Sequence, residues 1–110
     1  MNSEISLRGE KSNLFNNYDT ALTDSVTRHW YALLDKDESF GAGKVVLSFH
    51  LNDDGSITDM KVLDDKVGHE QAAICEKAVF ASAPFPDWPK DMIRMVGANY
   101  RIVTNTFSYY

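Results

Sequence analysis

The chain has 110 residues, a formal net charge of −5 and 44% hydrophobic residues, which is typical of one globular domain. An acidic chain without a lysine and arginine cluster is poorly suited to neutralise phosphates, so we expect no nucleic acid partner. The only cysteine is Cys75, which excludes a disulfide within the chain. The sequence contains no run of about 18 apolar residues, so it predicts no membrane span. We expect a flexible lead-in over residues 1–15 and one folded domain over residues 16–110.

A stripe of apolar residues, four positions apart, predicts a first helix that ends near Asp35. Its members are Tyr18, Leu22, Val26, Trp30 and Leu34. Asn16 and Asn17 have side chains that can cap its start. The polar positions expected to face solvent are Asp19, Thr23, Asp24 and Arg28.

A hairpin is predicted between Lys44 and Val62. Alternating apolar residues indicate a strand over residues 44–51, and the sequence Asn52-Asp53-Asp54-Gly55 is typical of a tight turn. The return strand runs from Ile57 to about Asp64. Its apolar residues change parity, which predicts a β-bulge near Thr58 or Asp59.

A second helix is predicted over residues 69–82, before the helix-breaking Pro84. It presents small side chains that allow close packing on a sheet: Ala72, Cys75, Ala78, Val79 and Ser82. A turn of helix is expected over residues 92–95, followed by a last strand from Gly97 to about Phe107.

These elements predict an α+β fold in the order helix-strand-strand-helix-strand. The simplest arrangement is a three-stranded sheet of antiparallel type, in the order 2-1-3, with two helices packed on one face. The third strand is then an exposed edge of the sheet.

Two segments resemble the C-terminal domain of TonB. The segment 43–51 with Asp54-Gly55-Ser56-Ile57 and Val62 is similar to the first hairpin of that family, and the segment 78–86 with Trp88-Pro89 is similar to the end of its second helix and the Pro-Phe-Pro exit. The upstream helix with Val26, Trp30 and Tyr31 fits the broader TonB/TolA type. The resemblance covers roughly residues 18–106.

The resemblance implies a periplasmic protein-interaction domain. TonB-like proteins are anchored in the inner membrane and contact outer-membrane receptors, to which they pass energy for transport. The receptor's short TonB box adds as a strand to the edge of the sheet. We expect the membrane anchor to be absent from this chain, and the domain to be tethered to the inner membrane if the chain belongs to a longer transducer.

The last strand is the expected partner-binding edge, because an edge strand offers backbone groups for pairing. Its residues are Gly97, Ala98, Asn99, Tyr100, Arg101, Ile102, Val103 and Thr104. The same edge can accept a second copy of the chain, which gives a homodimer. Two alternatives stay open: a TolA-like envelope scaffold that binds another envelope protein, and a small ligand-binding domain without catalysis.

No pattern in the sequence is typical of a catalytic or metal site, so we expect no enzyme activity, metal or cofactor. The histidines, His29, His50 and His69, have spacings that match no compact metal motif. Cys75 is expected to pack in the core rather than to react. The terminal Tyr109 and Tyr110 are expected either to fray or to extend the edge strand.

Overall fold

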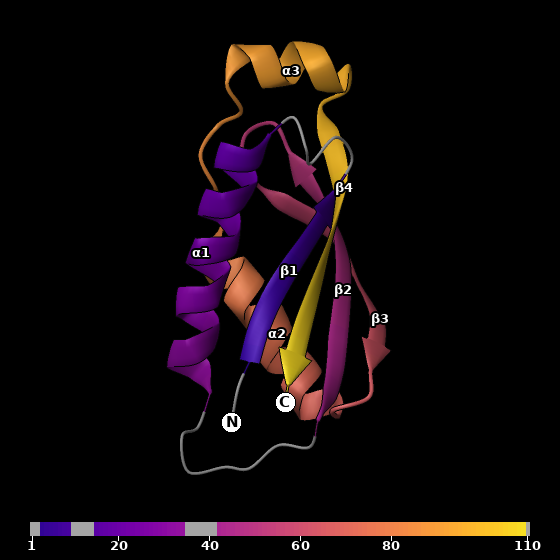
Figure 1. The fold of residues 1–110 in the computed structure, drawn as a ribbon. Coiled ribbons are helices and arrows are strands. Elements are labelled where there is room, and N and C mark those ends of the chain that lie inside the picture. The colour runs from indigo at the N-terminus through magenta and orange to yellow at the C-terminus, as the bar shows by residue number, and fades with distance from the viewer. Residues whose placement is uncertain (1–2, 10–14, 35–41, 110) are drawn as a thin grey trace.

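The structure is a computed structural model that describes residues 3–9, 15–34 and 42–109 (Figure 1). Its elements, in chain order, are β1 (Ser3–Gly9), α1 (Asn16–Leu33), β2 (Gly43–Asn52), β3 (Ile57–Asp65), α2 (His69–Ser82), α3 (Lys90–Val96) and β4 (Tyr100–Tyr109). Asp35 and Tyr110 lie outside the described residues. The fold is α+β, as expected. The turn of helix expected over residues 92–95 lies within α3, whereas β1 is a fourth strand that the sequence did not predict.

The strands form one antiparallel sheet in the order β1-β4-β2-β3. The expected order 2-1-3 corresponds to β3-β2-β4, and this part of the prediction is confirmed. The expected exposed edge is wrong over most of β4, because β1 pairs with it from Val103 to Tyr109. The sheet therefore has β1 and β3 at its two edges.

The flexible lead-in expected over residues 1–15 is wrong for residues 3–9, which form β1. This strand pairs antiparallel with β4 over seven residues, from Ser3 opposite Tyr109 to Gly9 opposite Val103. Ile5 and Leu7 alternate along it and pack against the core. Backbone pairing and two apolar side chains thus hold a segment that looks patternless in sequence.

The core lies between one face of the sheet and helices α1 and α2 (Figure 1). The strands contribute alternate residues, and the buried ones in the two central strands are Val45, Leu47, Phe49, Leu51, Arg101, Val103, Asn105, Phe107 and Tyr109. As predicted, α2 buries its small face, with Cys75, Ala78 and Val79 fully covered. Two of the β4 residues in this core, Arg101 and Asn105, are polar.

Helix α1 follows the predicted stripe, since Leu22, Val26 and Trp30 are buried. The predicted asparagine caps are wrong: Asn16 is the first helical residue, the N-cap is Phe15, and among the described residues no side chain caps this end. The backbone N–H of Asp19 instead donates to the carbonyl of Phe15 at 2.9 Å.

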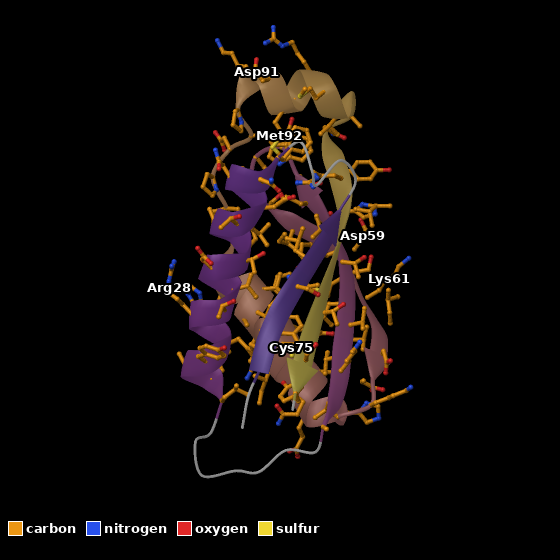
Figure 2. All side chains as sticks on the ribbon, in the orientation of Figure 1. Arg28, Asp59, Lys61, Cys75, Asp91 and Met92 are labelled. Atoms are coloured by element: carbon orange, nitrogen blue, oxygen red, sulfur yellow. The ribbon has the colours of Figure 1, made fainter. Side chains whose placement is uncertain are left out.

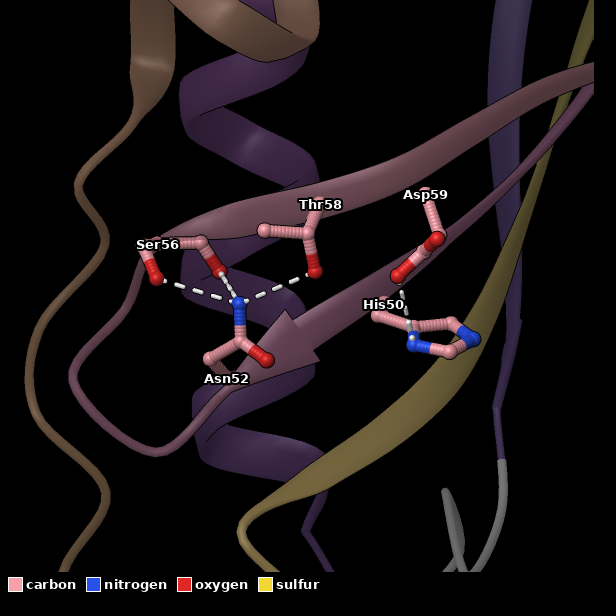
Figure 3. Close-up of polar contacts among 5 residues, drawn as sticks. All are labelled: His50, Asn52, Ser56, Thr58 and Asp59. Atoms are coloured by element: carbon pink, nitrogen blue, oxygen red, sulfur yellow. Dashed lines mark hydrogen bonds and ion pairs between the residues drawn. The ribbon is translucent and has the colours of Figure 1, made fainter.

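The hairpin has the expected turn and bulge. Gly55 has a φ of +84°, which glycine adopts without strain. The Asn52 side-chain amide donates to the backbone and hydroxyl oxygens of Ser56 and to Thr58 Oγ1 (Figure 3). The register shift places two residues opposite Phe49, and one of them, Asp59, has a φ of +54°. The predicted bulge at Thr58 or Asp59 is therefore confirmed.

The connector after α2 is fixed against this turn. Phe85 N–H donates to the carbonyl of Gly55 at 2.8 Å, and Trp88 N–H donates to the carbonyl of Asp53 at 3.0 Å. A Cβ atom on Gly55 would lie 1.8 Å from the Phe85 carbonyl oxygen. Glycine is thus required here for backbone conformation and for space.

Candidate functional site

The eight residues predicted as the partner-binding edge fall into two structural groups. Gly97 ends α3 with a φ of +71°, and Ala98 and Asn99 lie in the connection to β4. The carbonyl of Asn99 accepts a hydrogen bond from the N–H of Asp53 at 2.9 Å. The prediction of an edge strand is wrong for these three residues, because the αL conformation of Gly97 ends a helix rather than beginning a strand.

The other five predicted edge residues, Tyr100 to Thr104, belong to β4. Val103 and Thr104 pair with Gly9 and Arg8 of β1, so their outer edge is already occupied. Side chains alternate along the strand: Arg101 and Val103 are buried in the core, whereas Tyr100 and Ile102 are 40% and 41% exposed on the opposite face. The edge that the sequence predicted is therefore a central strand over most of its length.

Arg101 is anchored in the core by Asp19 of α1. Its Nη1 and Nη2 atoms donate to the Asp19 carboxylate at 2.7 and 3.1 Å, and its guanidinium lies 5.2 Å from the centre of the Phe15 ring. Arg101 is fully buried and Asp19 is 7% exposed. The expectation that Asp19 faces solvent is wrong, because this bidentate pair holds its carboxylate buried between α1 and β4.

The far end of β4 is held by a hydrogen-bonded group in the core. Trp30 Nε1 donates to the Tyr109 hydroxyl at 3.2 Å, and that hydroxyl donates to Gln71 Oε1 at 3.1 Å. Of the two alternatives for Tyr109, fraying is wrong and extension of the last strand is confirmed, since it is the last residue of β4 and only 2% exposed.

Cys75, labelled in Figure 2, joins the same group. Its Sγ atom lies 3.6 Å from the Tyr109 hydroxyl. Burial raises the pKa of the Cys75 thiol to about 12 and also raises the pKa of Tyr109. The thiol stays protonated at neutral pH, which a reactive cysteine does not. The expected core role of Cys75 is confirmed by its full burial.

Asn105 is the second polar residue on the buried face of β4, and sequence analysis did not single it out. Its Cα partners are Leu7 in β1 and Leu47 in β2. It is fully buried, and within the described part of the chain neither its side-chain nitrogen nor its side-chain oxygen has a hydrogen-bond partner.

The opposite face of the sheet carries a pair of stacked rings. The ring centres of His50 and Tyr100 are 4.4 Å apart with an interplanar angle of 9°. His50 Nδ1 also lies 3.1 Å from Asp59 Oδ2, across the bulge (Figure 3). No helix in the described part of the chain lies on this face (Figure 1).

The histidines occupy separate places. His29 lies beside Ser25 and Ser82 between the helices, His50 lies on the open face of the sheet, and His69 contacts Asp65 at the start of α2. Among residues 3–9, 15–34 and 42–109, no three histidine, cysteine, aspartate or glutamate side chains are grouped so that they could hold a metal ion.

Among the open grooves in the described part of the chain, two border α1. The larger, about 750 Å³, lies between the start of α1 and α3, and Met92 and Asp91 on its α3 side are labelled in Figure 2. The smaller, about 250 Å³, lies where α1 faces β1, and its lining is Leu7, Asn16, Asp19, Thr20, Thr23 and Asp24. Leu7 therefore lines this groove and also lies opposite Asn105 in the β1–β4 ladder.

Comparisons of the chain with protein-family models, with curated proteins and with solved structures found no match. No helix in the described ranges is both long enough and apolar enough to cross a membrane.

Proposed function

We propose that this chain is a protein-interaction domain of the TonB C-terminal type, which binds an extended segment of a partner by pairing it with β4 in the place of β1. The observation that carries the proposal is the β1–β4 ladder itself. A segment far away in sequence adds to β4 over seven residues, from Gly9 opposite Val103 to Ser3 opposite Tyr109. The β4 edge therefore has the length and shape to accept an added strand.

The contacts that hold β1 are ones that another strand can supply. Strand addition draws much of its affinity from main-chain hydrogen bonds, which do not depend on sequence. The side-chain contribution comes from Ile5 and Leu7, which are only partly buried. By contrast, β4 is also held by its ladder with β2, by the Arg101–Asp19 ion pair and by the hydrogen bond between Trp30 and Tyr109, none of which involves β1. An exchange of strands would therefore have to replace only the contacts of β1, including those of Ile5 and Leu7 with the core.

The resemblance to TonB suggests what the partner is. The proposed segment is the TonB box of an outer-membrane receptor, bound in the periplasm during energy-coupled transport, without cofactor or catalysis. The alternative partner, an envelope protein bound by a TolA-like scaffold, uses the same strand slot. Titration with a panel of TonB-box peptides and envelope-protein segments distinguishes the two, because only the correct class competes with β1.

A pair of variants tests the strand slot. Ile5→Asp places a charge in the core contact of β1, whereas Ser6→Asp adds the same charge at an exposed position of the same strand. Binding of a labelled peptide with the sequence of residues 3–9 is measured by fluorescence anisotropy. If β1 is displaced in about 3% of unmutated molecules, a variant in which it is displaced in all molecules binds the peptide up to about 30-fold more tightly. We expect this gain for Ile5→Asp and little change for Ser6→Asp.

Circular dichroism confirms that each variant is folded before titration. A folded Ile5→Asp variant that binds neither this peptide nor any member of the panel contradicts the proposal. Light scattering over a dilution series separates partner binding from the exchange of β1 between two copies, because only the latter depends on the concentration of the chain alone.

A further inference from the structure

Asn105 is a buried polar side chain on β4. Both atoms of its amide are without a partner among the described residues, and the residue is fully buried. Its cross-strand neighbours are Leu7 on one side and Leu47 on the other, and neither side chain can donate or accept a hydrogen bond. A buried polar group in this state is unfavourable, because it loses its hydrogen bonds to water and gains none in return.

Asn105 lies opposite one leucine in β1 and another in β2, and the two strands differ in whether another segment can take their place. Leu47 belongs to β2, which pairs with both β3 and β4 and supplies the centre of the core. Leu7 belongs to the edge strand, which is the one that the proposed function exchanges. Only the occupant of the β1 position can therefore change and bring Asn105 a partner.

We propose that Asn105 is a specificity-determining residue, which selects an incoming strand with a hydrogen-bonding side chain in the place of Leu7. This inference rests on the proposed function. Directly opposed residues of an antiparallel pair have Cβ atoms about 4.5–5.5 Å apart, a distance that an asparagine, glutamine, serine or threonine side chain can span. The preferred partner segment has an apolar residue opposite Phe107, in the place of Ile5, and such a polar residue two positions later.

The same contact disfavours a second copy of this chain as the partner. A strand exchanged between two copies brings leucine to the same place, so Asn105 stays without a hydrogen bond. A segment of a different protein with a polar residue there gains that bond. The inferred occupant is therefore an extended segment of another protein, and β1 is a weaker stand-in for it.

Two peptides test the inference in the full chain. One has the sequence of residues 3–9, and the other differs only by Leu7→Asn. Their binding is compared in the Ile5→Asp protein with Asn105 intact and after a further Asn105→Leu change. We expect the peptide with Leu7→Asn to bind about 10-fold more tightly when Asn105 is present, which corresponds to one hydrogen bond. Without Asn105 this preference should disappear or reverse.

A second measurement does not need an added peptide. Leu7→Asn in the full chain should slow amide hydrogen exchange in β1 when Asn105 is present and speed it in the Asn105→Leu background. Asn105→Ala replaces Asn105→Leu if the latter does not fold. Equal binding of the two peptides overturns the inference and leaves the proposed function standing. If neither these peptides nor any member of the panel of partner segments binds, the proposed function fails, and the inference about Asn105 fails with it. An exchange rate of β1 that does not depend on the residue at position 105 also overturns the inference.

Discussion

The two edges of the sheet are protected in different ways. The β3 edge is irregular: it has register shifts beside Leu47 and beside Phe49, and Leu63 and Asp59 lie where the ladder is interrupted. The β1 edge is a seven-residue ladder without such a shift. Bulges bend and twist an edge strand and make it a poor template for pairing.

On the proposed function, this difference separates a permanent edge from an exchangeable one. β3 is joined to β2 by a short turn that accepts backbone hydrogen bonds from Phe85 and Trp88, so it cannot leave without disrupting the hairpin. β1 is joined to the rest of the fold by its pairing with β4 and by the packing of Ile5 and Leu7. The sheet thus resists pairing at β3, while the β4 edge is available whenever β1 leaves.

The largest expected effect comes from breaking the ion pair between Asp19 and Arg101. This pair holds β4 against α1 and does not involve β1. Asp19→Ala leaves the charge of Arg101 buried without its carboxylate and should lower the free energy of unfolding by about 3–5 kcal/mol. Asp24→Ala, at an exposed position of the same helix, should change it by less than about 0.5 kcal/mol. Urea denaturation measures both. Equal, small effects would show that the pair does not anchor β4.

The turn beside β3 provides the next test. Gly55→Ala forces an unfavourable φ and a clash with the Phe85 carbonyl, and should destabilise the fold by about 3 kcal/mol or more. Gly97→Ala is a matched control, because Gly97 also has a positive φ but has no heavy atom within 4 Å of the added Cβ among the described residues. It should lose only about 1 kcal/mol. Similar losses would mean that the connector yields to the added methyl group.

Asn105→Leu should stabilise the protein while it removes the proposed selectivity. Replacing an unsatisfied buried amide by an apolar side chain of similar size should raise the free energy of unfolding by about 1–2 kcal/mol. Thr106→Val, at the next position on the opposite face of β4, controls for a general gain from apolar strand residues. A loss of stability in Asn105→Leu would indicate that the amide is satisfied in solution.

The smallest expected effect is a pH dependence from Cys75. The pKa of its thiol is about 12 in the folded protein, whereas the ordinary pKa of an exposed thiol is 9.0, so the unfolded chain releases this proton first as the pH rises. The stabilisation is complete below pH 9 and is lost as the pH rises toward 12, with a loss of about 1 kcal/mol between pH 9 and pH 10. Cys75→Ala should reduce this slope by the share of the thiol, as measured by urea denaturation at several pH values. A smaller slope should remain, because burial also raises the pKa of Tyr18 and Tyr109. An unchanged slope would assign it to other groups.

The elements with strong periodicity were predictable from the sequence. The second helix was predicted with the bounds that the structure shows for α2, because its small residues recur with helical spacing and Pro84 ends the pattern. The hairpin and its bulge were predictable because alternation changes parity after the Asn52–Gly55 turn. The local sequence thus determines the β2–β3 half of the sheet.

The β1–β4 half depends on contacts between distant residues. The apolar alternation in β1 is limited to Ile5 and Leu7, which is too short to distinguish a strand from a polar lead-in. The burial of Asp19 depends on Arg101, 82 positions later, and no local pattern reveals that pairing. A polar residue amid the apolar alternation of the last strand, as at Asn105, is the signal that could have indicated a special position.

Amide hydrogen exchange of β1 in the full chain tests the central claim most directly. If β1 is an exchangeable occupant of the β4 edge, its hydrogen-bonded amides should exchange through local opening, roughly 100-fold faster than the amides that join β2 and β4. Addition of a competing strand peptide should then remove the protection of β1 and leave that of β4 intact. Protection of β1 equal to that of the β2–β4 ladder, and unchanged by any peptide, would contradict the account.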